Sequence, residues 1–412
     1  MSSARPPESV SLRIALVTPS ISTSGGGVTT YIGDLVPRLC DAGHRVTVVT
    51  ADCEPGGAEP DKPIEMDKRA LLHLFPVRGR FNRRLYRSVE MSRWLDTAVR
   101  EFDVVDIQGL WSLIGIDAAR ACLSAGVPYV ITPHGMMTRW DWSKGPTSKR
   151  IFFAALLRKV WREAAAVRFS SHGELKNSMV APEAPATVIP NAVGVRAGEK
   201  PDSPSRDLHV RLDLPADAKI VLFLGRVTAQ KSVVELVKAF SLVQERCPDA
   251  YLVIAGPLDG EYGNTVQKLA SMNARRVRLL GPVFGKDKYD LFESASLFVT
   301  LSKNEGMPFA VLEALSFGVP VVITADSYLP EVEDFGAGTI TTCEPERAAG
   351  AISAMLLDPV QLSQMRGSAK RMIEQRFSWD FVVPQLIQLY QGAARKGAND
   401  REVDREKKEW AS

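Results

Sequence analysis

The chain has 412 residues, of which 45% are hydrophobic and 24% charged, and its net charge is +3. This length exceeds what one hydrophobic core supports and predicts two domains, and so small a charge argues against nucleic acid as a partner. Five scattered cysteines without a CxxC pair indicate reduced thiols and no metal site. No apolar run approaches the ~18 residues of a membrane-spanning helix. The polar residues 1–10 lack the apolar segment of a signal peptide, so we expect a disordered start and a cytoplasmic protein.

The first half of the chain alternates apolar strands with helices. Residues 12–18 and 45–50 are predicted strands on either side of a helix, and three glycines, Gly25 to Gly27, stand at that helix's N-terminus. Glycines at this place let a ligand approach free backbone N–H groups. Thr30 stands where the last glycine of a GxGxxG pattern would be, which disfavours an NAD-type dinucleotide. A sugar or phosphate contact at Gly26 and Gly27 stays open, and so does a tight turn without a ligand.

Two basic stretches rich in aromatic residues follow a polar segment, residues 52–70, that we expect to be a loop. They run from Arg78 to Arg93 and from Arg139 to Arg168, with helices expected over residues 84–100 and 148–165. Each stretch is either the solvated face of an amphipathic helix or a surface for anionic lipid or a lipid-linked substrate.

One histidine, His134, follows the predicted strand at residues 129–132. It therefore lies at the edge of a sheet where functional sites form, although histidines at such places also serve purely structural roles. Both interpretations stay open.

The clearest change in composition is a polar, proline-containing segment near residues 192–218, which we take as the interdomain connection. Strands and helices then alternate again, and Arg226 and Lys231 stand in the first strand-to-helix turn. Two cations there suit a diphosphate, unless both are solvated surface charges. We expect domains at residues 11–195 and 215–376, each a doubly wound α/β domain with a parallel sheet. A closing helix is expected at residues 377–392, followed by a charged, disordered tail.

Residues 297–325 form one predicted strand–helix–strand unit, with Pro308 near the helix start and Gly318 just past its end. Glu313 lies on this otherwise apolar helix, so its carboxylate needs polar partners. Glu305 stands at the helix entrance, where the helix dipole favours its ionised form. Two carboxylates thus frame the carboxyl edge of a parallel sheet, where α/β proteins bind ligands. Ordinary surface charges are the alternative.

These residues also match a known family. From about residue 12 to residue 390 the chain resembles the retaining nucleotide-sugar glycosyltransferases of the GT-B fold, glycosyltransferase family four. The most specific match is the E-x7-E pattern of Glu305 and Glu313 within SKNEGMPFAVLEALSFGVPVV. Supporting matches are the glycines before the first helix, Gly-His-x-Val at 43–46, Pro-His-Gly at 133–135, Pro-Asn at 190–191, Gly225-Arg226 with Lys231, and Phe-Ser-Trp at 377–379. The resemblance implies two Rossmann-like domains whose sheets face across a cleft, with helix 377–392 packing back on the first.

The same resemblance assigns roles to residues. Glu305 would bind hydroxyls of the donor sugar, Glu313 the ribose of the nucleotide, Arg226 and Lys231 the diphosphate, and His134 would face the reaction centre. The other implied donor-binding residues are Gly26, Gly27, Val283 beside the base, Gly306, Met307, Phe309 and Ala310. Many relatives have Phe-Gly where this chain has Met307-Pro308. Pro308 removes one backbone N–H but is tolerated in a first helical turn.

The activity implied is transfer of a hexosyl unit from a nucleoside-diphosphate sugar to a glycan or lipid-linked acceptor, with retention and without a cofactor or metal. We expect a role in cell-surface polysaccharide or glycolipid synthesis, with peripheral contact to the inner face of the membrane through the two basic stretches. A sugar-nucleotide epimerase, a glycan phosphorylase and a non-catalytic nucleotide- or glycan-binding protein are the alternatives.

Overall fold

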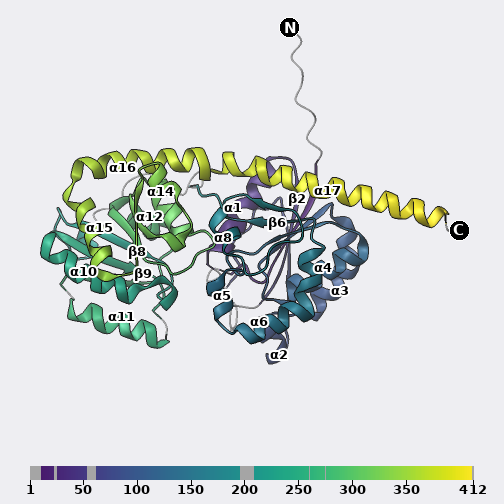
Figure 1. The fold of residues 1–412 in the computed structure, drawn as a ribbon, viewed down its shortest axis with the longest axis horizontal. Helices are drawn as coiled ribbons and strands as arrows, with labels where there is room; N and C mark the ends of the chain where they lie inside the picture. Colours follow the sequence, from purple (N-terminus) through teal and green to yellow (C-terminus); the bar gives the residue numbers. More distant parts are fainter. Residues whose placement is uncertain are drawn as a thin grey trace, which may run out of the picture. The chain divides into compact units, whose positions relative to one another are not determined.

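The computed structural model describes residues 11–22, 26–52, 62–194, 208–258, 260–273 and 275–410. They form two compact α/β units, drawn in Figure 1. Unit 1 comprises Met1–Ser170, Leu175–Ile189 and Val382–Ser412, and unit 2 comprises Ser171–Glu174 and Pro190–Phe381. The expected disordered start, Gly25 and much of the expected interdomain connection lie outside the described residues.

Unit 1 is built on a seven-stranded parallel sheet with the order β3-β2-β1-β4-β5-β6-β7 in its described residues. The strands are β1 (Arg13–Thr18), β2 (Arg45–Ala51), β3 (Leu71–Phe75), β4 (Val104–Gln108), β5 (Tyr129–Thr132), β6 (Ala166–Phe169) and β7 (Ala186–Val188). The helices are α1 (Gly27–Asp41), α2 (Arg80–Leu85), α3 (Val89–Ala98), α4 (Leu113–Ala125), α5 (Arg139–Ser143), α6 (Pro146–Phe152) and α7 (Arg158–Arg162). Helix α8 (His172–Lys176) begins in unit 2 and ends in unit 1.

Unit 2 contains a six-stranded parallel sheet with the order β10-β9-β8-β11-β12-β13. Its strands are β8 (Lys219–Leu224), β9 (Ala250–Ala255), β10 (Val277–Gly281), β11 (Ala295–Thr300), β12 (Val321–Thr324) and β13 (Gly338–Thr341). Its helices are α9 (Leu208–Arg211), α10 (Val233–Arg246), α11 (Gly260–Met272), α12 (Gly285–Ser294), α13 (Phe309–Ser316), α14 (Glu331–Asp334), α15 (Pro345–Leu357) and α16 (Pro359–Met372). Helix α17 (Trp379–Trp410) begins in unit 2 and continues in unit 1.

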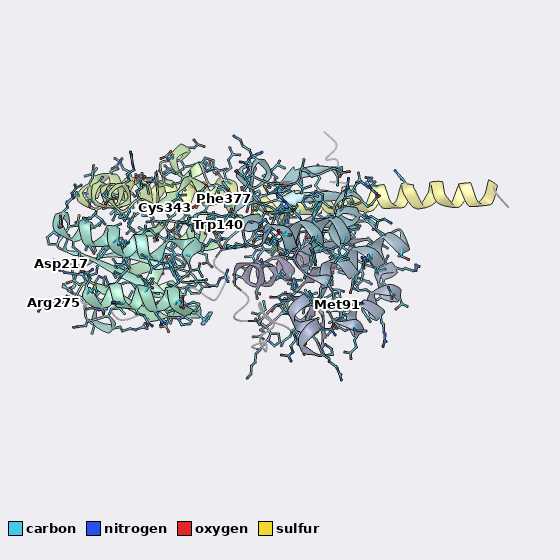
Figure 2. The ribbon with its side chains drawn as sticks, turned by 60° about the horizontal axis from the view of Figure 1, so that its bottom comes forward. Met91, Trp140, Asp217, Arg275, Cys343 and Phe377 are labelled. Carbon is cyan, nitrogen blue, oxygen red and sulfur yellow. The ribbon has the colours of Figure 1, made fainter. Side chains whose placement is uncertain are left out.

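The predicted fold class, two doubly wound α/β domains with parallel sheets, is confirmed. The central strands are buried apolar runs because helices cover both faces of a parallel sheet. Every residue of β4, β5 and β9 is buried. Figure 2 labels two core side chains, Met91 in unit 1 and Phe377 in unit 2, which are 1% and 2% exposed.

Three local expectations differ from the structure, and one strand was not predicted. The helix expected at residues 84–100 is two helices, because Tyr86 adopts a left-handed conformation (φ 49°) and Ser88 caps α3 by accepting from Met91 N. The helix expected at residues 148–165 contains a π-helical turn, Phe153–Leu157, between α6 and α7. Strand β3 was not predicted, and its leucines are largely exposed at the sheet edge. Helix α17 continues through the expected disordered tail to Trp410.

Candidate active site

The site in unit 2 lies where the strand order reverses, between β8 and β11. Ligands of doubly wound sheets bind beyond the carboxyl ends of the strands at such a switch point. The backbone there is tightly packed: a Cβ built on Gly256, after β9, would lie 1.9 Å from the carbonyl oxygen of Gly225, after β8. Only glycine fits at position 256, and the ends of β8 and β9 therefore carry no side chain at Gly225 and Gly256.

A lysine and a glutamate meet across this switch point. Lys231 ends the 3-10 turn Ala229–Lys231 after β8, and its Nζ forms an ion pair with Oε1 of Glu305, in the loop after β11. Their side chains are 22% and 10% exposed. The structure thus joins two residues that the sequence singled out separately.

The loop that carries Glu305 is fixed by backbone contacts on both sides. Gln230 donates from Nε2 to the carbonyl of Asn304 (2.8 Å), and its own carbonyl accepts from Lys303 N (2.8 Å). Glu305 N donates to the carbonyl of Asp326 (3.0 Å), which follows β12. The carboxylate is therefore held in place before any ligand arrives, as a preorganised site requires.

Glu313 has a polar partner, as expected for a carboxylate on an apolar helix. Lys288 Nζ, on α12, lies 2.6 Å from Glu313 Oε1, and both side chains are 19% exposed. The sequence did not identify Lys288. Helix α12 carries both Lys286 and Lys288, and nothing in the sequence spacing says which of them faces Glu313.

The segment between the two glutamates contains a buried methionine and the N-terminus of helix α13. Met307 is 8% exposed and packs in the unit 2 core, so only its backbone is suited to a ligand. Helix α13 begins at Phe309, with Pro308 at the N-cap, and no side chain of the described residues caps it. Ser171 Oγ donates to the carbonyl of Gly306 (3.2 Å).

The remaining candidates of unit 2 lie at strand ends. Arg226 is exposed just beyond β8, and Val283, between β10 and α12, is half-buried against the core. Ala310 is half-buried in the first turn of α13.

His134 belongs to unit 1 and follows β5 in a left-handed backbone conformation (φ 51°). Its Nε2 lies 2.6 Å from Oε1 of Gln108 at the end of β4. Since a carbonyl oxygen only accepts, Nε2 carries the proton and Nδ1 keeps the lone pair. Burial, together with the positive charge of Arg168, lowers the pKa of His134 to about 3, so the imidazole is neutral near pH 7.

The residues behind His134 form a buried polar network that the sequence did not reveal. Arg168, on β6, is fully buried; its Nε donates to the carbonyl of Ile189 (3.0 Å) and its guanidinium to the hydroxyl of Tyr31 (2.7 Å). Tyr390, on α17, donates to Asp106 Oδ2 on β4 (2.5 Å). Burial raises the pKa of Asp106 and raises that of Tyr390 well above its usual value. A buried arginine within an apolar strand was the only sequence signal.

Gly26 and Gly27, also in unit 1, stand at the N-terminus of α1 as expected. Gly26 is the exposed N-cap residue with φ 74°, and no described side chain caps this helix. Among the described residues, no group of three or more His, Cys, Asp or Glu could hold a metal ion. In the same part of the chain, no helix combines the length and apolar character needed to cross a bilayer.

Two protein families match most of the chain. The family described as "Glycosyl transferases group 1" matches residues 205–375, and the family "Glycosyl transferase 4-like domain" matches residues 26–192. The phosphatidyl-myo-inositol mannosyltransferase of Mycolicibacterium smegmatis is 26% identical over 94% of this chain and 95% of its own length. A GDP-mannose:cellobiosyl-diphosphopolyprenol alpha-mannosyltransferase of Xanthomonas oryzae is 27% identical over 72% and 76%. Sucrose-phosphate synthase of Thermosynechococcus elongatus superimposes with a TM-score of 0.72 at 20% identity, over 92% and 98% of the two chains.

Two doubly wound parallel-sheet units of this kind form the GT-B fold. The chain belongs to the group 1 glycosyltransferases, family four, a family of retaining hexosyltransferases.

Proposed function

We propose that this enzyme transfers a hexosyl unit from a nucleoside-diphosphate sugar to a lipid-linked or glycan acceptor, and that Glu305 and Lys231 carry the reaction. The observation behind this proposal is the Lys231–Glu305 ion pair at the switch point of unit 2, on a loop fixed by Gln230 and Asp326. A rigid carboxylate beside a lysine suits a donor whose sugar offers hydroxyl groups and whose diphosphate carries negative charge.

Charge stabilisation at the leaving diphosphate is the main task of the site. A lysine ammonium has three N–H donors, and Glu305 occupies one of those of Lys231, so two remain for phosphate oxygens. Arg226 is exposed at the end of β8 and adds a second cation. The uncapped N-terminus of α13, with Gly306, Met307, Phe309 and Ala310, contributes its dipole to the same charge.

The bond changes follow from retention. The bond from the anomeric carbon to the diphosphate oxygen breaks, and the acceptor oxygen bonds to the same carbon on the same face. The acceptor's proton passes to the departing phosphate oxygen, so Lys231 and Arg226 stabilise the developing negative charge and need not transfer a proton.

Glu313 is proposed as the ribose ligand. Lys288 binds its Oε1, which leaves Oε2 for ribose hydroxyl groups. Val283 is proposed to lie beside the base. From unit 1, the backbone of Gly26 and Gly27 and the neutral His134 are proposed to serve the donor, with His134 Nδ1 accepting a hydroxyl hydrogen bond.

The acceptor is proposed to be lipid-linked. The two mannosyltransferase relatives are named for phosphatidyl-myo-inositol and for a diphosphopolyprenol. In unit 1, the stretches from Arg78 to Arg93 and from Arg139 to Arg168 expose arginine and lysine side chains. Ile151, within the second stretch, is 64% exposed. Cations beside an exposed apolar side chain support peripheral contact with an anionic membrane.

Variants of the ion pair test the assignment. Glu305→Ala and Lys231→Ala should each abolish nucleotide release in the presence of an acceptor extract, while the circular dichroism spectrum stays that of a folded protein. Lys238→Ala, which removes an exposed lysine of α10, is the matched control and should transfer normally. Glu313→Ala should weaken nucleotide binding by calorimetry. Near-normal turnover by either Glu305→Ala or Lys231→Ala would overturn the proposal.

A further inference from the structure

A cavity of about 530 Å³ lies in unit 1. It is formed by α5, α6 and the segment after α8, and its lining residues are Arg139, Trp142, Ser143, Pro146, Arg150, Ser178 and Met179. Its size is within the range of small-molecule sites. Helix α5 follows the turn after His134, so the cavity belongs to the part of the chain that continues from β5.

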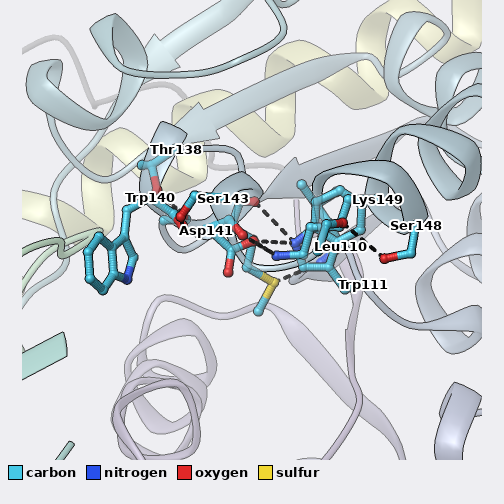
Figure 3. A network of polar contacts seen from close by, with 11 residues as sticks. Leu110, Trp111, Thr138, Trp140, Asp141, Ser143, Ser148 and Lys149 are labelled. Carbon is cyan, nitrogen blue, oxygen red and sulfur yellow. Dashed lines mark hydrogen bonds and ion pairs between the residues drawn. The ribbon is translucent and has the colours of Figure 1, made fainter. Parts of the chain in front are cut away.

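The walls of the cavity are held by polar and aromatic contacts. Figure 3 shows Asp141 of α5 joined to Lys149 of α6 and to the indole N–H of Trp111, the latter at 2.7 Å. Lys149 also lies 4.9 Å from the ring centroid of Trp111. Met179 N donates to the carbonyl of Met137 (2.7 Å), which fixes the third wall. These contacts hold α5, α6 and the Met179 segment together without a ligand.

The charges of these helices are unbalanced. Residues 139–150 carry four cations and one anion, Asp141, and Asp141 is already bound to Lys149 and Trp111. Among the described residues, neither Arg139 nor Arg150 has a carboxylate within ion-pair distance. The cavity therefore has two exposed guanidinium groups in its lining, each able to bind an oxyanion through paired N–H donors.

A buried indole ring also lines the cavity. Trp142 is 6% exposed and packs edge-on against Trp111, with ring centroids 5.8 Å apart. Its indole N–H is itself buried, so Trp142 serves as a reporter of a ligand bound beside its ring and is not counted among the donors. The hydroxyls of Ser143 and Ser178 already donate to backbone carbonyls.

We propose that this cavity binds the phosphate group of the acceptor. The proposal rests on the glycosyl transfer argued above and specifies its second substrate as a phosphate ester. Two guanidinium groups offer more paired N–H donors than the two oxygens of a carboxylate can use, whereas a phosphate presents three acceptor oxygens. Met179, 43% exposed, and Pro146 add apolar surface for the organic part of the ester.

Direct binding of a soluble probe tests the site without any donor sugar. sn-Glycerol 3-phosphate is titrated into the full chain and followed by the indole ¹H–¹⁵N resonances, that of Trp142 being assigned from Trp142→Phe. We expect the Trp142 resonance to shift with saturation, and glycerol to cause no shift. Arg139→Gln and Arg150→Gln should each weaken binding at least tenfold. Arg120→Gln, which removes an exposed arginine of α4 outside the cavity lining and outside both basic stretches, should leave it unchanged.

Three outcomes overturn the site. No shift of Trp142, or an equal loss in Arg120→Gln, would reduce the cavity to general surface charge. Binding to phosphatidylglycerol vesicles without binding of the soluble probe would assign Arg139 and Arg150 to the membrane surface instead. Donor binding, measured separately by thermal shift with GDP-mannose and UDP-glucose, is expected to be the same in all variants. If the unmodified protein bound neither nucleotide sugar, that result would contradict the proposed function and leave the phosphate site standing.

Discussion

The contact between Tyr390 and Asp106 predicts how firmly helix α17 is held in unit 1. Both residues are fully buried, and the tyrosine hydroxyl lies 2.5 Å from Asp106 Oδ2. Tyr390→Phe removes this hydroxyl and keeps the ring. Asp106 then retains the hydroxyl of Thr132, at 3.3 Å, but water cannot replace the lost donor at a site with no exposed surface. A hydrogen bond to a charged group contributes about 1.5–3 kcal/mol, so we expect a loss of about 2 kcal/mol.

Calorimetry and hydrogen exchange measure this loss. A destabilisation of about 2 kcal/mol lowers the melting temperature of a domain of ordinary size by roughly 4–8 °C, and the amides of α17 should exchange faster. Tyr390→Phe also removes an interaction that lowers the pKa of Asp106, so that pKa rises further. The deficit should therefore shrink as the pH falls and Asp106 becomes protonated.

The matched control is Tyr251→Phe in unit 2. The hydroxyl of Tyr251 makes no hydrogen bond among the described residues, so its removal should change the melting temperature by no more than 1–2 °C, as for substitutions that remove no named interaction. If Tyr390→Phe melts within the same margin, the Tyr390–Asp106 bond does not anchor α17 and the reasoning fails.

Two further predictions concern pH and the membrane. The pKa of His134 falls from 6.5 in the unfolded chain to about 3 in the fold, so its contribution to stability is complete above about pH 6.5 and is lost as the pH falls toward 3; at pH 5 the loss is about 2 kcal/mol. His134→Gln should lack this acid-dependent loss in denaturant titrations at pH 7 and pH 5, and an equal loss in both proteins would show that His134 is not the cause. The exposed cations near Ile151 should make the protein float with phosphatidylglycerol vesicles at low salt and dissociate at about 1 M salt, where screening is short-ranged. Protein left wholly in solution at low salt would remove the membrane contact.

The sequence predicted the fold well where apolar runs and helix-end residues agree. Pro345 and Pro359 mark the first residues of α15 and α16 in the structure, because proline suits the first turn of a helix. Strand β3 was not predicted. It lies at the sheet edge and leaves Leu71 64% exposed, so its apolar residues form neither a buried run nor an alternating pattern. The π-helical turn at Phe153–Leu157 was not predicted because one additional residue in a helical turn leaves no signal in the composition.

The residues of the candidate site could be proposed from the sequence, but the contacts between them could not. The requirement that Glu313 have a partner follows from one charged residue on an apolar helix, but the partner, Lys288, stands 25 positions away on another helix. Tyr390 and Asp106 are 284 positions apart. Such pairs depend on how elements pack, which local patterns do not specify. A charge inside an apolar strand, as with Arg168, shows only that some buried partner must exist.

The E-x7-E spacing acquires a physical meaning from these contacts. Glu305 precedes α13 and Glu313 lies near its end, so one carboxylate is on each side of the helix N-terminus. Each is paired with a lysine from a different element, Lys231 and Lys288. The two carboxylates are thus neutralised before a donor arrives, and an incoming diphosphate meets no unpaired negative charge from them. Because each lysine keeps N–H donors beyond the one given to its glutamate, the contacts that we propose with the donor's hydroxyl groups and phosphates do not require either pair to separate.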